Sequence, residues 1–465
     1  MHPPPLAGGT AGPGALRPLL DVVLDALTQG AKTRGGPLPG GGPHTVAQRV
    51  HDAAHDLLPT HGTGAEEALT TLVSALTEGA ADPAEPHCAA HLHTPPLALA
   101  AAADLAASAL NPSLDSWDQA PAASALEALL TRTLAQEIWP RGDALLTTGG
   151  TESNQLALLL AREHHGPPRI VCGAHTHHSI HRAAWLLGLP EPVVVPAPTG
   201  TTDLAALHAA LTGLHHHHPL LVVATAGTTD TGAIDPLPAI ADLCATHHAA
   251  LHVDAAYGGP LLFSDRHRHQ LNGLERADTV SLDLHKLGWQ PAAAGLIAVA
   301  DPHRLAPLTH TADYLNADDD TDAGLPDLLG RSLRTTRRPD ALKIAVTLRA
   351  LGRTGLADLV DRVCASARHL AQLIDQHDQL ELYEQPAIST VLFRPHHADD
   401  HTVAHIRRTL LTHGTAVLGR ARADGRLWLK ATLLNPHLTP HDLHTLIDTT
   451  LSATTPRTTT EGTPR

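Results

Sequence analysis

The sequence predicts an α/β protein with a mainly parallel sheet covered by helices. Between about residues 87 and 340, helical patterns alternate with short runs rich in β-branched residues. This order is typical of parallel strands joined by helices. Five runs are expected to be strands: 169–172, 220–224, 250–253, 279–282 and 296–299. Ligands of such sheets bind beyond the carboxyl ends of the strands, so functional residues are expected there.

The flanking segments have different patterns. Residues 16–29 carry apolar residues at helical spacing and predict an N-terminal helix. After about residue 341, long helical patterns precede a strand-like run at 389–394, a helix around 402–413 and a strand-like run at 427–431. We therefore expect an N-terminal helical arm with flexible Gly/Pro segments, a large domain, a smaller C-terminal α+β domain and a disordered tail, over residues 1–85, 86–340, 341–453 and 454–465 respectively.

The composition restricts the classes of partner. The 465 residues include 32 Lys and Arg against 47 Asp and Glu, a formal net charge of −15 that would repel nucleic acid and anionic membranes. Four cysteines are scattered without CxxC spacing, which favours a reduced, cytoplasmic protein. The first residues lack a basic segment followed by an apolar stretch, and the apolar run 97–110 is too short to span a bilayer. We expect neither a targeting segment nor a membrane span.

Three motifs carry polar chemistry in order along the chain. Residues 147–154, TTGGTESN, open an apolar helical run, and a Gly-rich turn at a helix start offers N–H groups to a phosphate. Asp254 ends a predicted strand, where a carboxylate can keep a pyridine nitrogen protonated. Lys286 follows the next predicted strand, where desolvation would free its amine to attack an aldehyde. Together the motifs supply the contacts that pyridoxal 5′-phosphate (PLP) requires.

Each motif also has a structural interpretation. The turn alone is typical of tight strand-to-helix connections, Asp254 of a helix N-cap and Lys286 of a solvated loop residue. The 37 His, with a run at 215–218, raise the alternative of a metal-binding or storage protein. That run has no Cys or acidic partner at the usual zinc spacing, so we predict no metal site.

From about residue 85 to 440 the chain resembles the group II PLP-dependent amino-acid decarboxylases, which include aromatic-amino-acid, glutamate, histidine and 2,4-diaminobutyrate decarboxylases. The matching motifs are TTGGTESN, THHSIHRAA, ATAGTTDTGAIDPL, HVDAAYGG, DLHKLGWQP and GRSLRTTRRPDALK. The resemblance implies PLP as cofactor and the fold-type I, aspartate-aminotransferase-like architecture, with a mainly parallel seven-stranded sheet in the large, PLP-binding domain. It also implies an obligate homodimer with active sites at the subunit interface.

The resemblance assigns four catalytic roles. Lys286 would carry PLP as a Schiff base, Asp254 would pair with the pyridine nitrogen, and His177 would stack on the ring. Tyr314 lies in an acidic, Gly-containing segment, 312–324, and matches a tyrosine that the family donates to the neighbouring subunit from a mobile loop to protonate Cα. An exposed tyrosine is also a common surface residue, so this assignment depends on the resemblance. The implied cofactor contacts are Gly149, Gly150, Thr151, His177, Thr225, Asp254, Ala256, His285 and Lys286.

The substrate side favours a diamino acid. His91 and His93 lie where aromatic decarboxylases offer aromatic residues, and 111–119, NPSLDSWDQ, resembles the diaminobutyrate and lysine decarboxylase subgroup. Asp115 or Asp118 would receive a distal ammonium, although both are equally compatible with helix caps or surface acids. We therefore predict CO₂ release from 2,4-diaminobutyrate or lysine, through an external aldimine and a quinonoid. Aromatic, aliphatic or acidic substrates and an aldehyde-forming reaction stay open.

Overall fold

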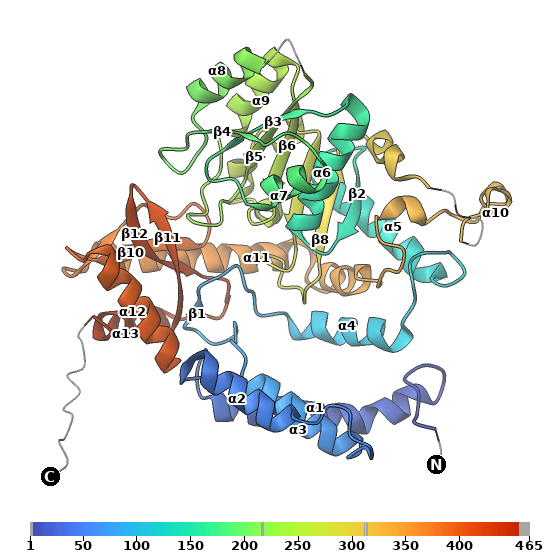
Figure 1. Cartoon of the computed structure of the whole chain (residues 1–465), viewed down its shortest axis with the longest axis vertical. Coiled ribbons are helices and arrows are strands. Elements are labelled where there is room, and N and C mark those ends of the chain that lie inside the picture. Colours follow the sequence, from blue (N-terminus) through green and yellow to red (C-terminus); the bar gives the residue numbers. More distant parts are fainter. Residues whose placement is uncertain (1–2, 215–217, 311, 313–314, 455–465) are drawn as a thin grey trace. The chain divides into compact units, whose positions relative to one another are not determined.

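The region of alternating patterns forms a seven-stranded sheet in a computed structural model, which describes residues 3–214, 218–310, 312 and 315–454 (Figure 1). The strands are β2 (Asp143–Thr147), β3 (Arg169–Gly173), β4 (Val193–Val195), β5 (Leu220–Thr225), β6 (Ala250–Ala255), β7 (Thr279–Asp283) and β8 (Gly295–Val299). Their order across the sheet is β2-β8-β7-β6-β5-β3-β4. Neighbours from β7 to β4 are parallel, whereas β8 is antiparallel to both β7 and β2. The sheet is therefore mainly parallel, as the sequence predicts.

Helices cover both faces of this sheet. Every residue of β5, β7 and β8 is buried, so neither side of these strands faces water. The helices of this region are α4 (Ala98–Leu110), α5 (Pro121–Ala135), α6 (Gly150–His165), α7 (Ser179–Leu186), α8 (Leu204–Leu214), α9 (Leu237–His247) and the short α10 (Asp318–Asp322). On one face α6 and α7 pack over the strands through an apolar cluster that includes Leu158, Ile180 and Val223. Short 3₁₀ helices lie at Gly259–Phe263, Arg268–Leu271, Leu274–Arg276, Pro302–Leu308 and Leu329–Arg331.

The five strands that the sequence predicts in this region are all present, with ends within two residues of the expected ones. The sequence pattern does not predict β2 or β4. The first is a short Leu-containing run between two helical patterns, and periodicity alone does not separate a buried strand from a helix. The second has three valines between prolines, which is too short for a clear alternation.

Contacts divide the chain into two compact units. One comprises residues 94–364 and 386–389 and contains the seven-stranded sheet. The other comprises residues 1–93, 365–385 and 390–465, in so far as these are described. The helix α11 (Ala341–Asp375) begins in the unit of the seven-stranded sheet and ends in the other unit. Of the predicted C-terminal tail, the structure describes Thr454.

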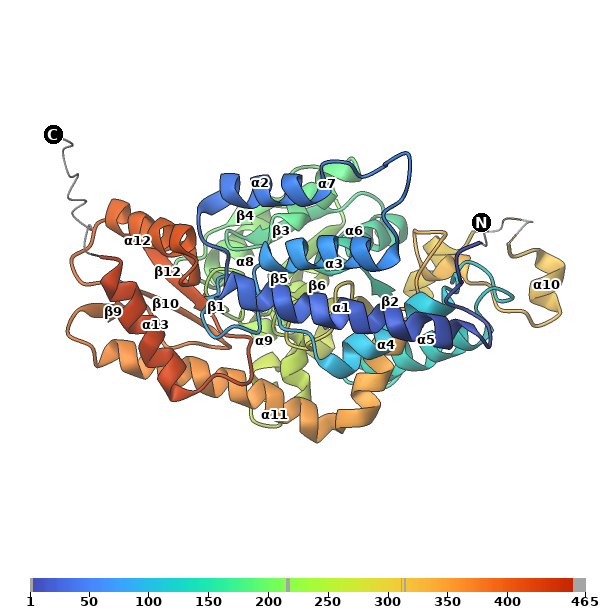
Figure 2. The ribbon, with the colours of Figure 1, turned by 90° about the horizontal axis from the view of Figure 1, so that it is seen from below.

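The second unit, as far as it is described, is built on a five-stranded sheet in the order β1-β11-β12-β10-β9. Its strands are β1 (Cys88–Ala89), β9 (Leu380–Leu382), β10 (Thr390–Pro395), β11 (Val417–Ala423) and β12 (Arg426–Thr432). The helices α12 (Asp400–His413) and α13 (Pro440–Ser452) lie on this sheet (Figure 2), where Phe393, Ile406 and Leu446 share one core. The predicted strands at 389–394 and 427–431 and the predicted helix at 402–413 are thereby confirmed as β10, β12 and α12.

The N-terminal segment of this unit is helical. It consists of α1 (Gly12–Arg34), α2 (Gly42–Ala54) and α3 (Ala65–Glu78), and both α1 and α2 pack against α3 (Figures 1 and 2). The predicted helix over 16–29 is confirmed as α1. Within the described ranges, no helix combines the length and the apolar character needed to cross a membrane.

A buried ion pair joins α5 to the segment that precedes α11. Arg337 Nη1 donates hydrogen bonds to both carboxylate oxygens of Glu127, at 2.8 and 2.9 Å. The two side chains are only 2% and 6% exposed. Such a pair contributes little by forming but costs much when it loses one partner, because the remaining charge stays buried.

Replacing Arg337 by Ala is expected to lower the free energy of unfolding by about 3–5 kcal/mol, since Glu127 would keep a buried, unpaired charge. Urea unfolding followed by circular dichroism measures this loss. The double variant Glu127→Leu with Arg337→Met should recover most of it, because no buried charge remains. A single variant as stable as the parent protein would show that the pair has no such role.

Candidate active site

Side-chain alternation on two neighbouring strands gathers the polar residues of the site. Successive residues of a strand point to opposite faces of the sheet, so His252 and Asp254 of β6 share one face. Thr279, Ser281 and Asp283 of β7 share a face for the same reason. The strands are parallel, with His252 aligned with Thr279 and Asp254 with Ser281. The two rows therefore lie side by side on one face of the sheet.

Asp254 is a buried carboxylate near the end of β6. Asn154 Nδ2 donates to its Oδ2 at 2.8 Å, while Ser281 Oγ and the Ala256 N–H donate to Oδ1 at 3.2 and 3.1 Å. Burial alone would raise the pKa of Asp254, but the Asn154 hydrogen bond and the charge of Lys286 outweigh it and hold the pKa below its ordinary value. The carboxylate is therefore ionised at neutral pH, and Oδ2 retains a lone pair for a further donor.

Lys286 follows β7, and its amine lies next to the carboxylate of Asp283. Its Nζ is 2.9 Å from Oδ2 of Asp283, a side chain that is 2% exposed. The Lys286 charge also acts on Asp254. Burial lowers the pKa of the neighbouring His285, although Asp283 opposes this effect. The other Asp283 oxygen, Oδ1, is buried and has no hydrogen-bond partner among the described residues.

The Gly-rich turn between β2 and α6 lies beside these groups. Gly149 has φ 156°, a conformation that other residues rarely adopt. A Cβ atom at Gly150 would lie 2.9 Å from Cβ of Ala256 and 3.3 Å from Oδ2 of Asp283. A Cβ atom at Gly149 would lie 3.0 Å from Cε1 of His285. The turn and the first N–H groups of α6 therefore come close to the lysine-bearing segment because neither glycine has a side chain.

A third glycine, on β8, shapes the same turn. A Cβ atom at Gly295 would collide with the backbone of Gly149 and approach the hydroxyl of Thr147 to 2.5 Å. The close approach is possible because β8 lies next to β2, with Gly295 aligned with Thr147. Thr151, in the first turn of α6, is exposed.

His177 and Thr225 complete the predicted cofactor contacts. His177 Nδ1 lies 2.8 Å from Ser179 Oγ. Burial lowers the pKa of His177 although the Asp254 carboxylate opposes this, so the imidazole is neutral at pH 7. Thr225 ends β5 and is aligned with Asp254 of the neighbouring strand β6. Its hydroxyl is buried and has no hydrogen-bond partner in the described part of the chain.

The predicted substrate residues lie in several segments. Asp115 is buried and accepts a hydrogen bond from Gln119 Nε2 at 2.7 Å, while Asp118 accepts one from Ser116 Oγ at 2.6 Å. A cavity of about 310 Å³ is lined by Trp117, Asp118, Leu315, Asn316, Asp320, Thr321, Leu325 and Pro326. Tyr314 is outside the described residues.

His91 and His93 belong to the unit that contains the five-stranded sheet. Burial lowers the pKa of both imidazoles. For His91, the positive charges of Lys430 and Arg407 act in the same direction. Both rings are therefore neutral at pH 7.

Sequence reasoning assigns no role to four residues that the structure places in the site. These are Asn154, His252, Ser281 and Asp283; Asn154, His252 and Asp283 stand inside the recognised motifs, and Ser281 lies two residues before the last of these. Strand alternation could have identified His252, because it precedes Asp254 by two residues and so points to the same face of the sheet. Ser281 and Asp283 share a face for the same reason. Asn154 lies one helical turn after Gly150, on the same side of α6.

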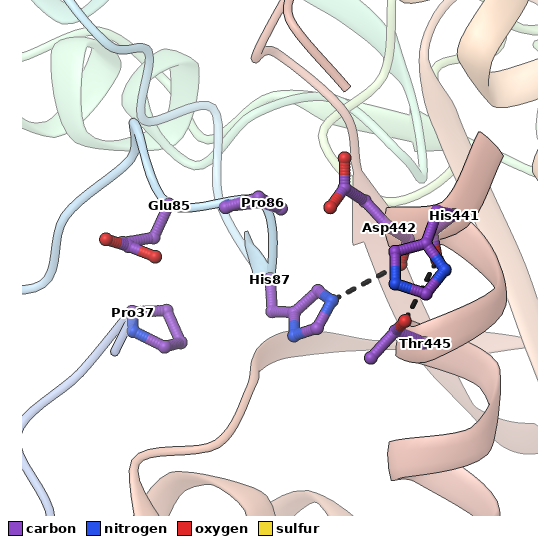
Figure 3. Close-up of a pocket in the computed structure, with 7 residues that line it drawn as sticks. All are labelled: Pro37, Glu85, Pro86, His87, His441, Asp442 and Thr445. Carbon is purple, nitrogen blue, oxygen red and sulfur yellow. Dashed lines mark hydrogen bonds between the residues drawn. The ribbon is translucent and has the colours of Figure 1, made fainter. Parts of the chain in front are cut away.

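Another hollow, of about 250 Å³, lies within the unit of the five-stranded sheet (Figure 3). It is lined by Pro37, Glu85, Pro86, His87, His441, Asp442 and Thr445. His87 Nε2 lies 3.2 Å from the backbone oxygen of Asp442. The lining contains neither a lysine nor a Gly-rich turn, so this hollow does not meet the requirements of a PLP site. Across the described ranges, no three His, Cys, Asp or Glu side chains converge in a way that could hold a metal ion.

The groups around Asp254 and Lys286 fit PLP. The Gly-rich turn opens a helix whose N–H groups suit a phosphate, and the ionised Asp254 has a lone pair available for a protonated pyridine nitrogen. Lys286 supplies an amine that can bind an aldehyde. The buried hydroxyl of Thr225 lacks a partner among the described residues, as expected for a group that meets a bound molecule.

Comparison with known proteins decides the family. Residues 53–396 match the model of the pyridoxal-dependent decarboxylase conserved domain. The chain belongs to the pyridoxal-dependent decarboxylase family. This decarboxylase is 42% identical over 454 residues to the L-2,4-diaminobutyrate decarboxylase of Rhizobium meliloti, and the match covers 93% of this chain and 90% of the relative.

Solved structures agree with this assignment. A crystal structure described as the glutamate decarboxylase domain of diaminobutyrate-pyruvate transaminase and L-2,4-diaminobutyrate decarboxylase from Vibrio parahaemolyticus matches with a TM-score of 0.86 and 32% identity, over 97% of both chains. Oryza sativa TDC with PLP and tryptamine matches with a TM-score of 0.87 over 96% of this chain and 99% of that one; at 24% identity it shows the fold alone. The predicted fold-type I architecture, PLP dependence and decarboxylase class are thereby confirmed.

Replacing Gly150 by Ala is expected to weaken PLP binding by about tenfold or more, because the new methyl group must displace Ala256 or the turn itself. Titration of the cofactor-free protein with PLP measures the change in Kd. Gly213→Ala on α8 is the matched control, since a Cβ atom there meets nothing within 4 Å. Equal PLP affinity in the two variants would contradict the importance of the close approach.

Proposed function

We propose that this decarboxylase releases CO₂ from an L-diamino acid, with 2,4-diaminobutyrate as the first candidate and lysine as the second. The observation that carries the proposal is the convergence of Lys286, the ionised Asp254 and the Gly-rich turn on one face of the sheet. The substrate class is supported by the similarity to the diaminobutyrate decarboxylase of Rhizobium meliloti.

In this proposal, Lys286 binds the cofactor through Nζ, and Gly149, Gly150 and Thr151 bind its phosphate at the positive end of α6. When bound, PLP supplies an aldehyde that condenses with amines and a pyridine ring that accepts the electron pair left behind by CO₂. Asp283 orients the Lys286 amine, whose Nζ lies 2.9 Å from its Oδ2. His285 lies against the turn and limits its space.

The remaining contacts orient the ring and protect its charge. Asp254 holds a proton at the pyridine nitrogen, which its ionised state and free lone pair support. His177 covers one face of the ring, and Thr225 and Ala256 lie close to it. The side chains of Asp254, Thr225 and Ala256 are buried, and that of His177 is half-buried. Water therefore has little access to the place where charge develops.

We also propose that the enzyme is a cytoplasmic homodimer and that Tyr314 of the partner subunit supplies the proton to Cα. The family resemblance and the exposed apolar residues of α1 and α3 support the dimer; Leu24 and Leu76 are 60% and 71% exposed. All four cysteines lie in described segments and are thiols rather than disulfides, which supports a reducing compartment.

The purified protein is expected to show a visible absorption band from PLP bound to Lys286, and Lys286→Ala should abolish it. Borohydride should fix the cofactor covalently to the parent protein but not to this variant. Lys32→Ala, at an exposed position of α1, is the control and should retain the band. A band of equal strength in Lys286→Ala would remove the proposed site.

Asp115→Ala is expected to raise KM for L-2,4-diaminobutyrate by about tenfold or more, with a much smaller effect on L-2-aminobutyrate, because only the diamino acid carries a distal ammonium. Asp118→Asn tests the other candidate carboxylate in the same way. Carbon dioxide release from both substrates supplies the measurement. Equal effects on the two substrates in both variants would eliminate the proposed ammonium site.

A further inference from the structure

A buried hydrogen-bond network connects β7 and β6 to α6 at the candidate site. Thr279 Oγ1 lies 2.9 Å from His252 Nδ1, and His252 Nε2 lies 2.9 Å from Asn154 Oδ1. Asn154 Nδ2 lies 2.8 Å from Asp254 Oδ2 and 2.8 Å from Ser179 Oγ. Each of these five side chains is buried, so water does not replace a missing partner.

The network has one direction, which Asp254 sets. An ionised carboxylate only accepts hydrogen bonds, so Asn154 must present its amide nitrogen to Asp254 and its oxygen to His252. The Nε2 atom of His252 therefore carries a hydrogen and donates it to Asn154. Burial lowers the pKa of His252 to about 4, so the ring is neutral and Nδ1 accepts the hydrogen of the Thr279 hydroxyl.

A second branch extends the same direction to His177. One hydrogen of the Asn154 amide is used by Asp254, and the other is donated to Ser179 Oγ. The Ser179 hydroxyl then has its own hydrogen free to donate to His177 Nδ1, at 2.8 Å. Since the His177 ring is neutral and its Nδ1 accepts, its hydrogen is on Nε2.

We propose that Asn154 and His252 are positioning residues which, through this single direction of hydrogen bonds, keep Asp254 ionised and fix His177 as its Nε2–H tautomer. The proposal rests on the roles of Asp254 and His177 at the cofactor ring proposed above. A reversed Asn154 amide would place its oxygen against the ionised carboxylate and remove the donor at Asp254 Oδ2. This buried mismatch leaves the amide one stable orientation, which in turn requires the hydrogen of His252 on Nε2.

Neutron diffraction from deuterium-exchanged crystals of the enzyme tests the direction without any substitution. The expected result is deuterium on Nε2 of both His252 and His177, with Nδ1 of both rings bare. Deuterium on Nδ1 of either ring would overturn the proposal. This outcome does not depend on activity, so it stays decisive even if the proposed substrate, or the proposed roles at the cofactor, are wrong.

The effect on the cofactor is tested with Asn154→Asp, which has the same shape but replaces the donor by an acceptor. We expect PLP binding about tenfold weaker or more, because a hydrogen bond to a buried charge is lost. The ¹⁵N signal of PLP labelled at its ring nitrogen should also shift towards the unprotonated form. Unchanged affinity and an unchanged ¹⁵N signal in a folded variant would overturn the proposal.

The distal end of the network offers a milder test. Thr279→Val removes the hydroxyl that donates to His252 and should weaken PLP binding by about threefold, whereas Thr279→Ser retains the hydroxyl and should restore the affinity. Thr212→Val, which removes an exposed hydroxyl from α8, controls for the general effect of the exchange on stability. A purely structural role would lower the melting temperature of Thr279→Val and leave the ¹⁵N signal unchanged, which would contradict the proposal.

Discussion

A carboxylate that is buried and still ionised is the constraint on which the active centre depends. Removing the Asp254 charge from water is costly unless donors surround it. The structure meets this requirement with Asn154 from α6, Ser281 from β7 and the backbone of Ala256. The packing of α6 over the two strands is therefore an electrostatic requirement as well as a means of covering apolar surface.

Much of the fold could be predicted because its signals are local. The runs that form β3, β5, β6, β7 and β8 are rich in β-branched residues and follow helical patterns, so each is recognisable from its own few residues. Asp254 and Lys286 could be predicted for the same reason, since each stands at the end of such a strand, whereas Gly149 could be predicted because its Gly-rich turn opens an apolar helical run. β2 and β4 lack this signal, and their place in the sheet depends on the neighbours with which they pair.

The supporting residues could not be predicted because their partners are distant in the sequence. Asn154 precedes Asp254 by 100 residues, and their contact follows only once α6 lies over β6. The alignment of Asp254 with Ser281, and hence of His252 with Thr279, is a matter of strand register. The proposed substrate residues are harder still to predict, since Asp115 and Asp118 lie in a segment outside the regular elements, which tertiary contacts position.

The antiparallel strand β8 has a consequence for the order in which the chain can mature. It lies between β2 and β7, and its Gly295 abuts the turn at Gly149. When the chain has emerged from the ribosome only as far as Lys286, all the residues that are proposed to contact the cofactor are present, but β2 still lacks its neighbour in the sheet. The turn at Gly149 therefore gains its packing partner only after residues 295–299 emerge, so we expect the chain to bind PLP at a late stage of its biogenesis.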